Sequence, residues 1–159
     1  LYSSVYDVST TICRFYNVYG PHQLTDGDYC TVVGIFETQY KDGKSLTITG
    51  DGEQRRDFTH VDDIVDGLIK CGDGLLGEGS SVVNGEEFEL GRGVNFSINE
   101  VADMFGEDYP REYLPLRKGE YDKTLCTDTK AKELLGWNPT RNLNDYMKDF
   151  VETERFLNE

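Results

Sequence analysis

The sequence predicts one folded unit of the α/β or α+β class, in which helices outnumber strands. Its 159 residues are enough for one sizeable core, since single domains commonly run to ~100–200 residues. Hydrophobic residues make up 37% and aromatic residues 12% of the chain, which separates it from disordered segments. Segments with helical spacing of apolar residues alternate with short β-branched runs, and no repeat or linker divides them.

The first part of the chain predicts two helices and two strands. Residues 1–7 resemble the end of a helix, and the β-branched run at residues 10–14 predicts a short buried strand. Residues 17–21 have the composition of a loop that ends this strand. Apolar residues at helical spacing predict a helix over residues 31–41, and alternation over residues 45–49 predicts a half-buried strand.

The next predicted helix follows Thr59, whose hydroxyl can cap the free amides of the first turn. Its apolar stripe at helical spacing consists of Val61, Ile64, Val65, Leu68 and Ile69. Ser97 and Glu100 form a capping box at the start of another helix. Short strands are expected at residues 82–83, 88–90 and 113–116.

Two helices are predicted near the end of the chain. Asp128 and Thr129 can cap a short helix, which Gly136 ends in the manner of a left-handed C-cap residue. Residues 143–157 carry apolar side chains on one side and predict the last helix.

Charge and hydropathy exclude several classes of function. Thirty acidic and 16 basic residues give a net charge of −14, which disfavours binding to nucleic acid and to anionic membranes. No apolar run approaches the ~18 residues of a membrane span, and the start lacks the features of a secretion signal. We therefore expect a soluble cytoplasmic protein. Because the chain begins at Leu1, inside a predicted helix, we also expect it to be cut from a longer parent.

The four cysteines are Cys13, Cys30, Cys71 and Cys126. They form no CxxC pair and have no histidine cluster nearby in the sequence, so neither a zinc site nor a redox motif is indicated. We expect ordinary reduced thiols and no metal.

Arginines are the most informative polar residues of this acidic chain. Arg14, Arg55, Arg56, Arg92 and Arg117 fall at predicted strand ends or in glycine-containing loops. Guanidinium groups bind phosphate well because their planar donors meet two oxygens at once. The alternative is that they form surface ion pairs with carboxylates, each worth only ~0–1 kcal/mol. The spacing alone leaves these two interpretations about even.

Other polar motifs give weaker signals. Gly50-Asp51-Gly52 is neither a P-loop nor a dinucleotide fingerprint, because the required neighbours are absent. His60 is expected to form structural hydrogen bonds, although catalysis stays open, and His22 has no partner suggested by the sequence. Asp62 and Asp63 favour the positive end of their helix.

Four long motifs in register carry a resemblance to a known family. They are RFYNVYGP from Arg14, GDGEQRRDFTHVDD from Gly50, RKGE from Arg117 and DTKAKELLGWNP from Asp128. Together they resemble the NAD-dependent nucleotide-sugar epimerases and dehydratases, the extended short-chain dehydrogenases that include UDP-glucose 4-epimerase. The resemblance covers almost the entire chain. It implies that residues 1–159 are the C-terminal, nucleotide-sugar-binding part of an extended Rossmann-type enzyme, of mixed α+β structure with a residual Rossmann strand.

The resemblance also implies roles for single residues. Asn17 matches a residue that hydrogen-bonds the diphosphate or the sugar, and Arg56 and Arg117 match the arginines that hold the diphosphate. Glu120 matches an acidic position that binds a ribose hydroxyl. Val33 is a weaker match to a position near the diphosphate. Thr47 and Thr49 are weaker matches to strand positions near the nucleobase. The residues matched to the nicotinamide end of the cofactor site are Phe15 and Tyr16.

Two departures from the family pattern limit what the chain is expected to do. Glu89 stands where the family usually has Asn, which puts the local packing in doubt. In the family, the glycine fingerprint, the catalytic Ser or Thr and the Tyr-x-x-x-Lys pair belong to an N-terminal half that this chain is expected to lack. We therefore expect the chain alone neither to bind NAD nor to catalyse the family's transient oxidation at sugar C4. The partners implied are a nucleotide sugar and either an N-terminal half or a second copy. The alternative is a non-catalytic module that associates with a partner or with itself.

Overall fold

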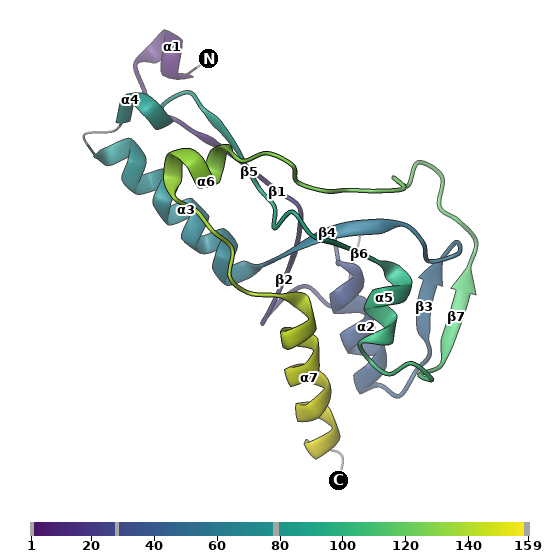
Figure 1. The fold of residues 1–159 in the computed structure, drawn as a ribbon. Helices are drawn as coiled ribbons and strands as arrows, with labels where there is room; N and C mark the ends of the chain where they lie inside the picture. The colour runs from purple at the N-terminus through teal and green to yellow at the C-terminus, as the bar shows by residue number, and fades with distance from the viewer. Residues whose placement is uncertain (1, 28, 78–79, 158–159) are drawn as a thin grey trace.

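A computed structural model of the protein describes residues 2–27, 29–77 and 80–157. The helices are α1 (Tyr2–Tyr6), α2 (Val32–Lys41), α3 (Val61–Leu76), α4 (Ser80–Val83), α5 (Ile98–Asp103), α6 (Lys130–Leu135) and α7 (Leu143–Leu157). The strands are β1 (Ile12–Phe15), β2 (Asn17–Tyr19), β3 (Leu46–Thr49), β4 (Arg55–His60), β5 (Glu87–Leu90), β6 (Asn95–Ser97) and β7 (Arg111–Leu114). The predicted α/β class is confirmed, and Leu1 of the first predicted helix lies outside the described residues (Figure 1).

Three small sheets form the frame of the molecule. β1 pairs with β5, and β3 pairs with β7, both in parallel. In the central sheet, β4 lies between β2, which is parallel to it, and β6, which is antiparallel. Only Tyr16 separates β1 from β2, so the chain passes from one sheet into the next at this residue. Figure 1 shows α3 and α6 beside the β1–β5 pair and α2 and α5 beside the β3–β7 pair.

Several predicted helix ends are confirmed. Thr31 caps α2 by accepting a hydrogen bond from the Gly34 amide. Ser97 and Glu100 form the predicted capping box of α5, in which each side chain accepts from the other residue's backbone amide. Gly136 ends α6 with a φ of 60°, in the left-handed region that favours glycine.

Some predicted elements are wrong. Residues 17–19 form strand β2 because they pair with β4, although their composition indicates a loop. Residues 82–83 belong to the short helix α4, and the strand expected at 113–116 is β7, which begins earlier at Arg111. Strands β4 and β6 were not predicted, because polar residues dominate both and tertiary pairing holds them.

The cap of α3 also differs from the prediction. His60, not Thr59, is the N-cap residue, and its Nδ1 accepts a hydrogen bond from the Asp62 amide. The Thr59 hydroxyl instead accepts from the Arg92 amide, so it joins β4 to the turn after β5.

Two apolar cores lie on either side of the central sheet. The larger core surrounds Phe36, Phe58 and Phe105 and includes residues from α2, β3, α5 and α7. The smaller core surrounds Phe88, Leu90 and Trp137 and includes residues from α3, β5 and α6. Asp63 fixes the chain between α6 and α7, because its side chain accepts hydrogen bonds from the amides of Thr140 and Arg141.

The apolar stripe of α3 faces a different way than predicted. The buried face contains Ile64, Gly67 and Cys71, and a Cβ at position 67 would come 2.8 Å from Leu90, so glycine is needed for this close packing. Val65, Leu68 and Ile69 are 47%, 42% and 56% exposed. The helix therefore carries a second apolar face that nothing covers among the described residues. No helix in the described ranges has the length and apolar character of a membrane span.

We predict that stability depends on the protonation of Glu37, which is buried on α2. Burial raises its pKa above the ordinary 4.5, and hydrogen bonding with Tyr146 and Gln23 opposes this only in part. Because the folded state holds the Glu37 proton more tightly than the unfolded state, protonation of Glu37 stabilises the folded state, and this stabilisation is complete at low pH. The stabilisation is lost as the pH rises from 4.5 through the raised pKa.

Urea denaturation of the wild type and of Glu37→Gln at pH 5 and pH 8 checks this prediction. The neutral amide does not titrate, so the variant should gain stability relative to the wild type at the higher pH. An unchanged difference between the two proteins at both pH values would contradict it.

Candidate functional site

One cavity brings together most of the residues expected to bind a substrate. It has a volume of about 190 Å³ and lies between the start of α2, the β3–β7 pair and the loop after β7. Six of the seven predicted substrate-binding residues line it: Asn17, Thr47, Thr49, Arg56, Arg117 and Glu120. These residues come from positions far apart in the sequence, so the fold alone assembles them.

Val33 is the exception. It is completely buried in the larger core, and its neighbour Val32 lines the cavity instead. The helix turns Val33 away from the cavity because successive residues on a helix point about 100° apart.

Arg56 is the partly buried cation of this cavity. Its side chain is 14% exposed, and its Nη2 lies 3.3 Å from Oε1 of Glu120. Its Nη1 donates a hydrogen bond to the Arg55 carbonyl at 2.9 Å. Oε2 of Glu120 is buried without a hydrogen-bond partner, so an acceptor remains free at the wall of the cavity.

Arg117 is the second cation, and it is exposed at the cavity wall. Among the described residues, its guanidinium has no ion-pair or hydrogen-bond partner, so all its donors are available to a ligand. The other three candidate arginines have partners. Arg14 pairs with Glu87, Arg55 pairs with Glu100, and Arg92 donates to the Arg141 carbonyl. Pairing with protein groups is therefore observed for Arg14, Arg55 and Arg92, and binding of phosphate stays a prediction for Arg56 and Arg117.

The edge of β3 presents backbone groups to the cavity. The amides of Leu46 and Gly50 donate toward the β7 side, so Thr47 and Thr49 between them face the opposite edge. There, the Thr47 amide donates to Gln39, and the Thr49 carbonyl accepts from Gln54. The Thr47 carbonyl and the Thr49 amide have no partner in the described part of the chain.

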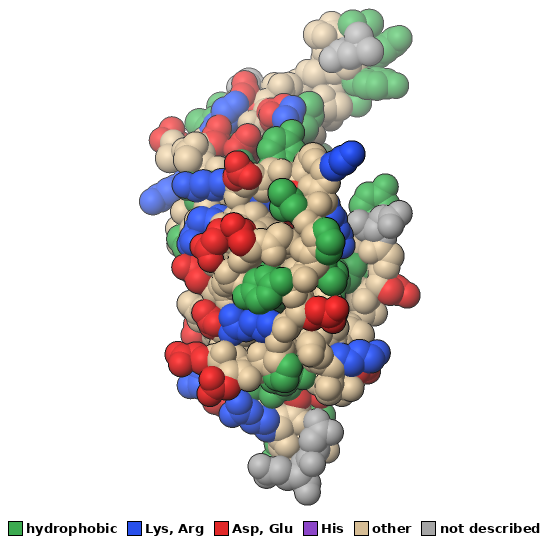
Figure 2. All heavy atoms as spheres, turned by 90° about the vertical axis from the view of Figure 1, so that its right-hand side faces the viewer, with side chains coloured by type: hydrophobic (Ala, Val, Ile, Leu, Met, Phe, Trp, Pro, Cys, Tyr) green, Lys and Arg blue, Asp and Glu red, His purple; other side chains and the backbone are tan. Residues whose placement is uncertain are grey.

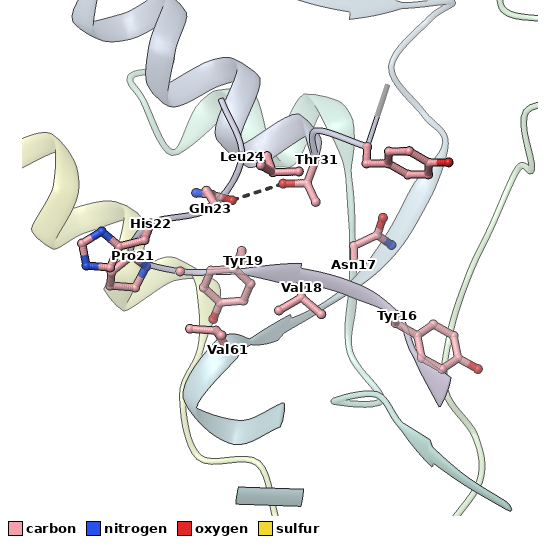
Figure 3. Close-up of a pocket in the computed structure, with 12 residues that line it drawn as sticks. Tyr16, Asn17, Val18, Tyr19, Pro21, His22, Gln23, Leu24, Thr31 and Val61 are labelled. Atoms are coloured by element: carbon pink, nitrogen blue, oxygen red, sulfur yellow. Dashed lines mark hydrogen bonds between the residues drawn. The ribbon is translucent and has the colours of Figure 1, made fainter. Parts of the chain in front are cut away.

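Asn17 stands where the cavity meets a second one. Its Nδ2 donates to the Asp57 carbonyl at 3.2 Å, which fixes the carboxamide and leaves Oδ1 available. The second cavity has a volume of about 510 Å³ and shares Asn17 and Thr31 with the first. Figure 3 shows Asn17 pointing toward the segment that carries Leu24 and Thr31, on the opposite side of the cavity.

Asp57 supports this arrangement from behind. Its carboxylate is completely buried and accepts hydrogen bonds from the backbone amides of Arg92, Gly93 and Cys126 at 2.9–3.1 Å. Burial raises the pKa of Asp57, and these amide donors oppose that rise because they favour the ionised form. Since side chains alternate along a strand, Arg56 points to the other face of β4, toward the cavity.

Tyr16 lies at one end of the larger cavity, and Phe15 precedes it at the end of β1. Phe15 is 48% exposed at the end of β1, and Tyr16 lines the cavity. The Tyr16 hydroxyl points away from Asn17 in Figure 3 and donates to Glu89 at 2.7 Å. Glu89, the residue that departs from the family pattern, thus has a local role in holding the Tyr16 ring.

The junction of β4 and α3 does not form a pyrophosphate seat in the described residues. Such a seat requires a glycine-rich turn between a strand and a helix, whose amides face the phosphates. β4 ends at His60 and α3 begins at Val61, and the Nδ1 atom of His60 accepts a hydrogen bond from the Asp62 amide in the first turn of the helix.

His60 has a structural role in this arrangement. It is 6% exposed, caps α3 and packs edge-on against Tyr19. Burial lowers the pKa of His60, so the neutral ring that accepts the cap hydrogen bond is favoured. No cluster of three possible metal ligands occurs in the described ranges of the chain.

Sequence reasoning missed Gln39 and Gln54, which fix the edge of β3. Gln39 follows the cavity-lining Ile35 by one helical turn, and this spacing is the only signal that could have indicated it. The Gly50-Asp51-Gly52 turn before Gln54 has a structural reason for its glycines. Both have positive φ, and a Cβ on Gly52 would come 2.2 Å from Asn99.

The fold and the site together define an α/β protein with a paired-arginine cavity at the edge of parallel strands. Residues 1–91 match the profile of the NAD dependent epimerase/dehydratase family. The chain is 33% identical over 156 residues to UDP-glucose 4-epimerase of Mycolicibacterium smegmatis, with 96% of this chain and 47% of that protein covered.

Solved structures agree with this match. UDP-glucose 4-epimerase of Thermotoga maritima, crystallised with UDP-glucose, is 34% identical with a TM-score of 0.82, and the match covers 99% of this chain and 50% of that one. UDP-glucuronic acid 4-epimerase of Bacillus cereus, in complex with UDP-glucuronic acid and NAD, is 29% identical with a TM-score of 0.81; 98% of this chain and 48% of that one are covered.

The chain therefore belongs to the NAD dependent epimerase/dehydratase family. It spans about half the length of the curated relatives that it matches.

We predict that the Asp57 carboxylate is needed to hold β4, the turn after β5 and the segment before α6 in place around the cavity. In Asp57→Asn, an NH₂ group replaces one acceptor oxygen and faces backbone amide donors, which leaves buried donors unsatisfied. The free energy of unfolding should fall by about 3 kcal/mol. Urea denaturation at pH 7 measures the loss.

Asp42→Asn is the matched control, because its side chain is exposed and, among the described residues, pairs only with Lys44. It should change the free energy of unfolding by less than ~1 kcal/mol. Equal stability losses in the two variants would show that the Asp57 contacts do not hold the site.

Proposed function

We propose that residues 1–159 form the nucleotide-sugar-binding portion of an NAD-dependent sugar epimerase or dehydratase. The observation that carries this proposal is the cavity in which Arg56 and Arg117 lie together with Asn17. In a chain with a net charge of −14, two cations in one cavity make a local site for an anion. The surface around β3 and β7 carries acidic and basic groups intermixed (Figure 2), so the overall surface gives no comparable attraction.

A diphosphate suits the two arginines. Arg117 has all its donors available, and the Arg56 guanidinium is oriented by Glu120 and by the Arg55 carbonyl. Fixed, partly buried donors bind phosphate oxygens with little loss of side-chain entropy. The carboxamide of Asn17, held by Asp57, adds a neutral contact between the two cavities.

A uracil base suits the edge of β3. The Thr47 carbonyl can accept a hydrogen bond and the Thr49 amide can donate one, and both groups lack a protein partner in the described ranges. Uracil presents a donor next to an acceptor along one edge, which complements this pair. The known ligands UDP-glucose and UDP-glucuronic acid of similar proteins support the same choice. The larger cavity of about 510 Å³ is then the place for the sugar.

The remaining parts of the reaction belong to the half of the relatives that this chain does not span. NAD supplies hydride transfer at sugar C4 when it is bound, and Phe15 and Tyr16 form a wall for its nicotinamide end. The residues of this chain bind the nucleotide and orient the sugar. The chain alone is proposed not to catalyse the reaction. Its G-x-G-x-x-G spacing, residues 72–77, lies at the end of α3 and not between a strand and a helix, where a dinucleotide fingerprint is needed. Its Tyr-x-x-x-Lys spacing, residues 40–44, lies at the end of α2, where Tyr40 packs against the larger core.

We predict that Arg117→Ala weakens the binding of UDP-glucose by roughly 10- to 150-fold, the effect of losing a charged hydrogen-bond partner of the phosphate. Isothermal titration calorimetry measures the affinity. Arg56→Ala should have a similar or greater effect, and it should also lower stability because Glu120 loses its partner.

Arg155→Ala is the matched control, since it removes the same charge from the exposed end of α7, outside both cavities. It should leave the affinity within about twofold of the wild type. Equal affinities of Arg117→Ala and the control, or no binding to any of the proteins, would reject the proposed site.

A second function, a module that associates through apolar surface, is favoured by two exposed faces. Parallel strands are normally covered on both faces, yet Ile12 on β1 is 54% exposed. Val65, Leu68 and Ile69 on α3 are also open to solvent. In this proposal the partner is either a second copy or a polypeptide equivalent to the N-terminal half of the relatives.

We predict that the chain self-associates at micromolar concentration and that the double variant Leu68→Glu and Ile69→Glu is monomeric. Charges on this face would be desolvated in an interface, whereas the exposed positions tolerate them in the monomer. Light scattering after size exclusion measures the mass. The control is Leu157→Glu, an exposed apolar residue at the end of α7, which should still associate. A monomeric wild type would reject self-association.

A further inference from the structure

Cys13 and Cys71 are two thiols from different elements that meet at the smaller core. Cys13 lies on β1 and is partly exposed, and Cys71 lies on α3 and is buried. Their sulfur atoms are 3.4 Å apart, although 58 positions separate them in the sequence. We propose that Cys13 and Cys71 are an oxidative modification site, which forms a reversible intramolecular disulfide when a hydroperoxide is the oxidant.

The geometry requires only a small movement. A disulfide bond is ~2.05 Å long, so the two sulfurs must approach by about 1.4 Å. The Cys13 thiol already points at the Cys71 sulfur. β1 is covered on only one face, where Cys13 packs, because the flanking Ile12 and Arg14 are exposed.

The chemistry has a defined order. Burial raises the pKa of Cys71 to about 12, so the more accessible Cys13 meets the peroxide first. The Cys13 sulfur attacks one oxygen of hydrogen peroxide and breaks the O–O bond, which gives a sulfenic acid and one water; an organic hydroperoxide would release its alcohol in place of this water. The Cys71 sulfur then attacks the Cys13 sulfur. The S–S bond forms, the S–O bond breaks, and the leaving oxygen takes the Cys71 proton as a second water. The two sulfurs together lose two electrons, and the peroxide gains them.

The other two cysteines serve as internal controls. The Cys30 sulfur contacts the backbone carbonyl of Leu24 at 2.9 Å, and the Cys126 sulfur contacts oxygens of Glu89 and Asp128. Neither has a thiol partner within the described ranges. Peroxide should therefore leave both of them available for alkylation, or oxidise them without forming an internal cross-link.

The cross-link would join β1 to α3 immediately before Tyr16 and Asn17. A disulfide that closes a long loop restricts the unfolded chain, so oxidation should raise the thermal unfolding midpoint by roughly 5–10 °C. This effect would be reversed by dithiothreitol.

Peptide mapping of the peroxide-treated protein tests the proposal. The chain is treated with hydrogen peroxide, alkylated, digested without reduction and examined by mass spectrometry. A peptide pair joining Cys13 and Cys71, two hydrogens lighter than the reduced pair and absent after dithiothreitol, is expected. Alkylatable or sulfinic Cys13 with no such pair would overturn the proposal.

Thermal unfolding of variants gives an independent test. The peroxide-induced rise should disappear in Cys13→Ser and in Cys71→Ser and should persist in Cys30→Ser. If Cys71→Ser fails to fold, Cys13→Ser carries the comparison, because its side chain is partly exposed. A rise that persists in Cys13→Ser would overturn the proposal.

Discussion

The buried carboxylate of Asp57 is the contact on which the candidate site depends. It accepts hydrogen bonds from three backbone amides, which belong to the turn after β5 and to the segment that leads into α6. The Asp57 carbonyl also holds the Asn17 carboxamide, and strand alternation directs the neighbouring Arg56 into the cavity. Close packing holds the same two segments together, since a Cβ on Gly91 would come 2.3 Å from the Cβ of Cys126. One buried charge therefore fixes the position of several ligand-facing groups.

In the proposed function, electrostatics favours a small anion in the cavity of a strongly acidic chain. A net charge of −14 repels anions from most of the surface, and three of the five candidate arginines are engaged by protein groups. Arg117 is unengaged among the described residues, and Arg56 is oriented by a single carboxylate. This combination suits a small ligand with a compact double charge better than an extended polyanion. The diphosphate of a nucleotide sugar has that character.

Most helices and most residues that line the candidate cavity could be predicted from the sequence, and several strands could not. Capping chemistry is local, so Ser97, Glu100 and Gly136 indicated their helix ends correctly. β2 and β4 are polar and are held by pairing with each other, which local composition does not encode. The buried face of α3 was misjudged because it uses Gly67 and Cys71, small residues that a stripe of large apolar side chains overlooks. Val33 does not line the cavity for a similar reason, since a match by position does not specify which way the side chain of a helix residue points.

The central claim is that the edge of β3, Asn17 and the two arginines bind one nucleoside diphosphate. Titration of the ¹⁵N-labelled chain with UDP, followed by two-dimensional NMR, tests this most directly. Saturable shifts are expected at the backbone amide of Thr49, at the side-chain amide of Asn17 and at the Nε resonances of Arg56 and Arg117. Shifts confined to other parts of the chain, or no saturable shift at millimolar UDP, would contradict it.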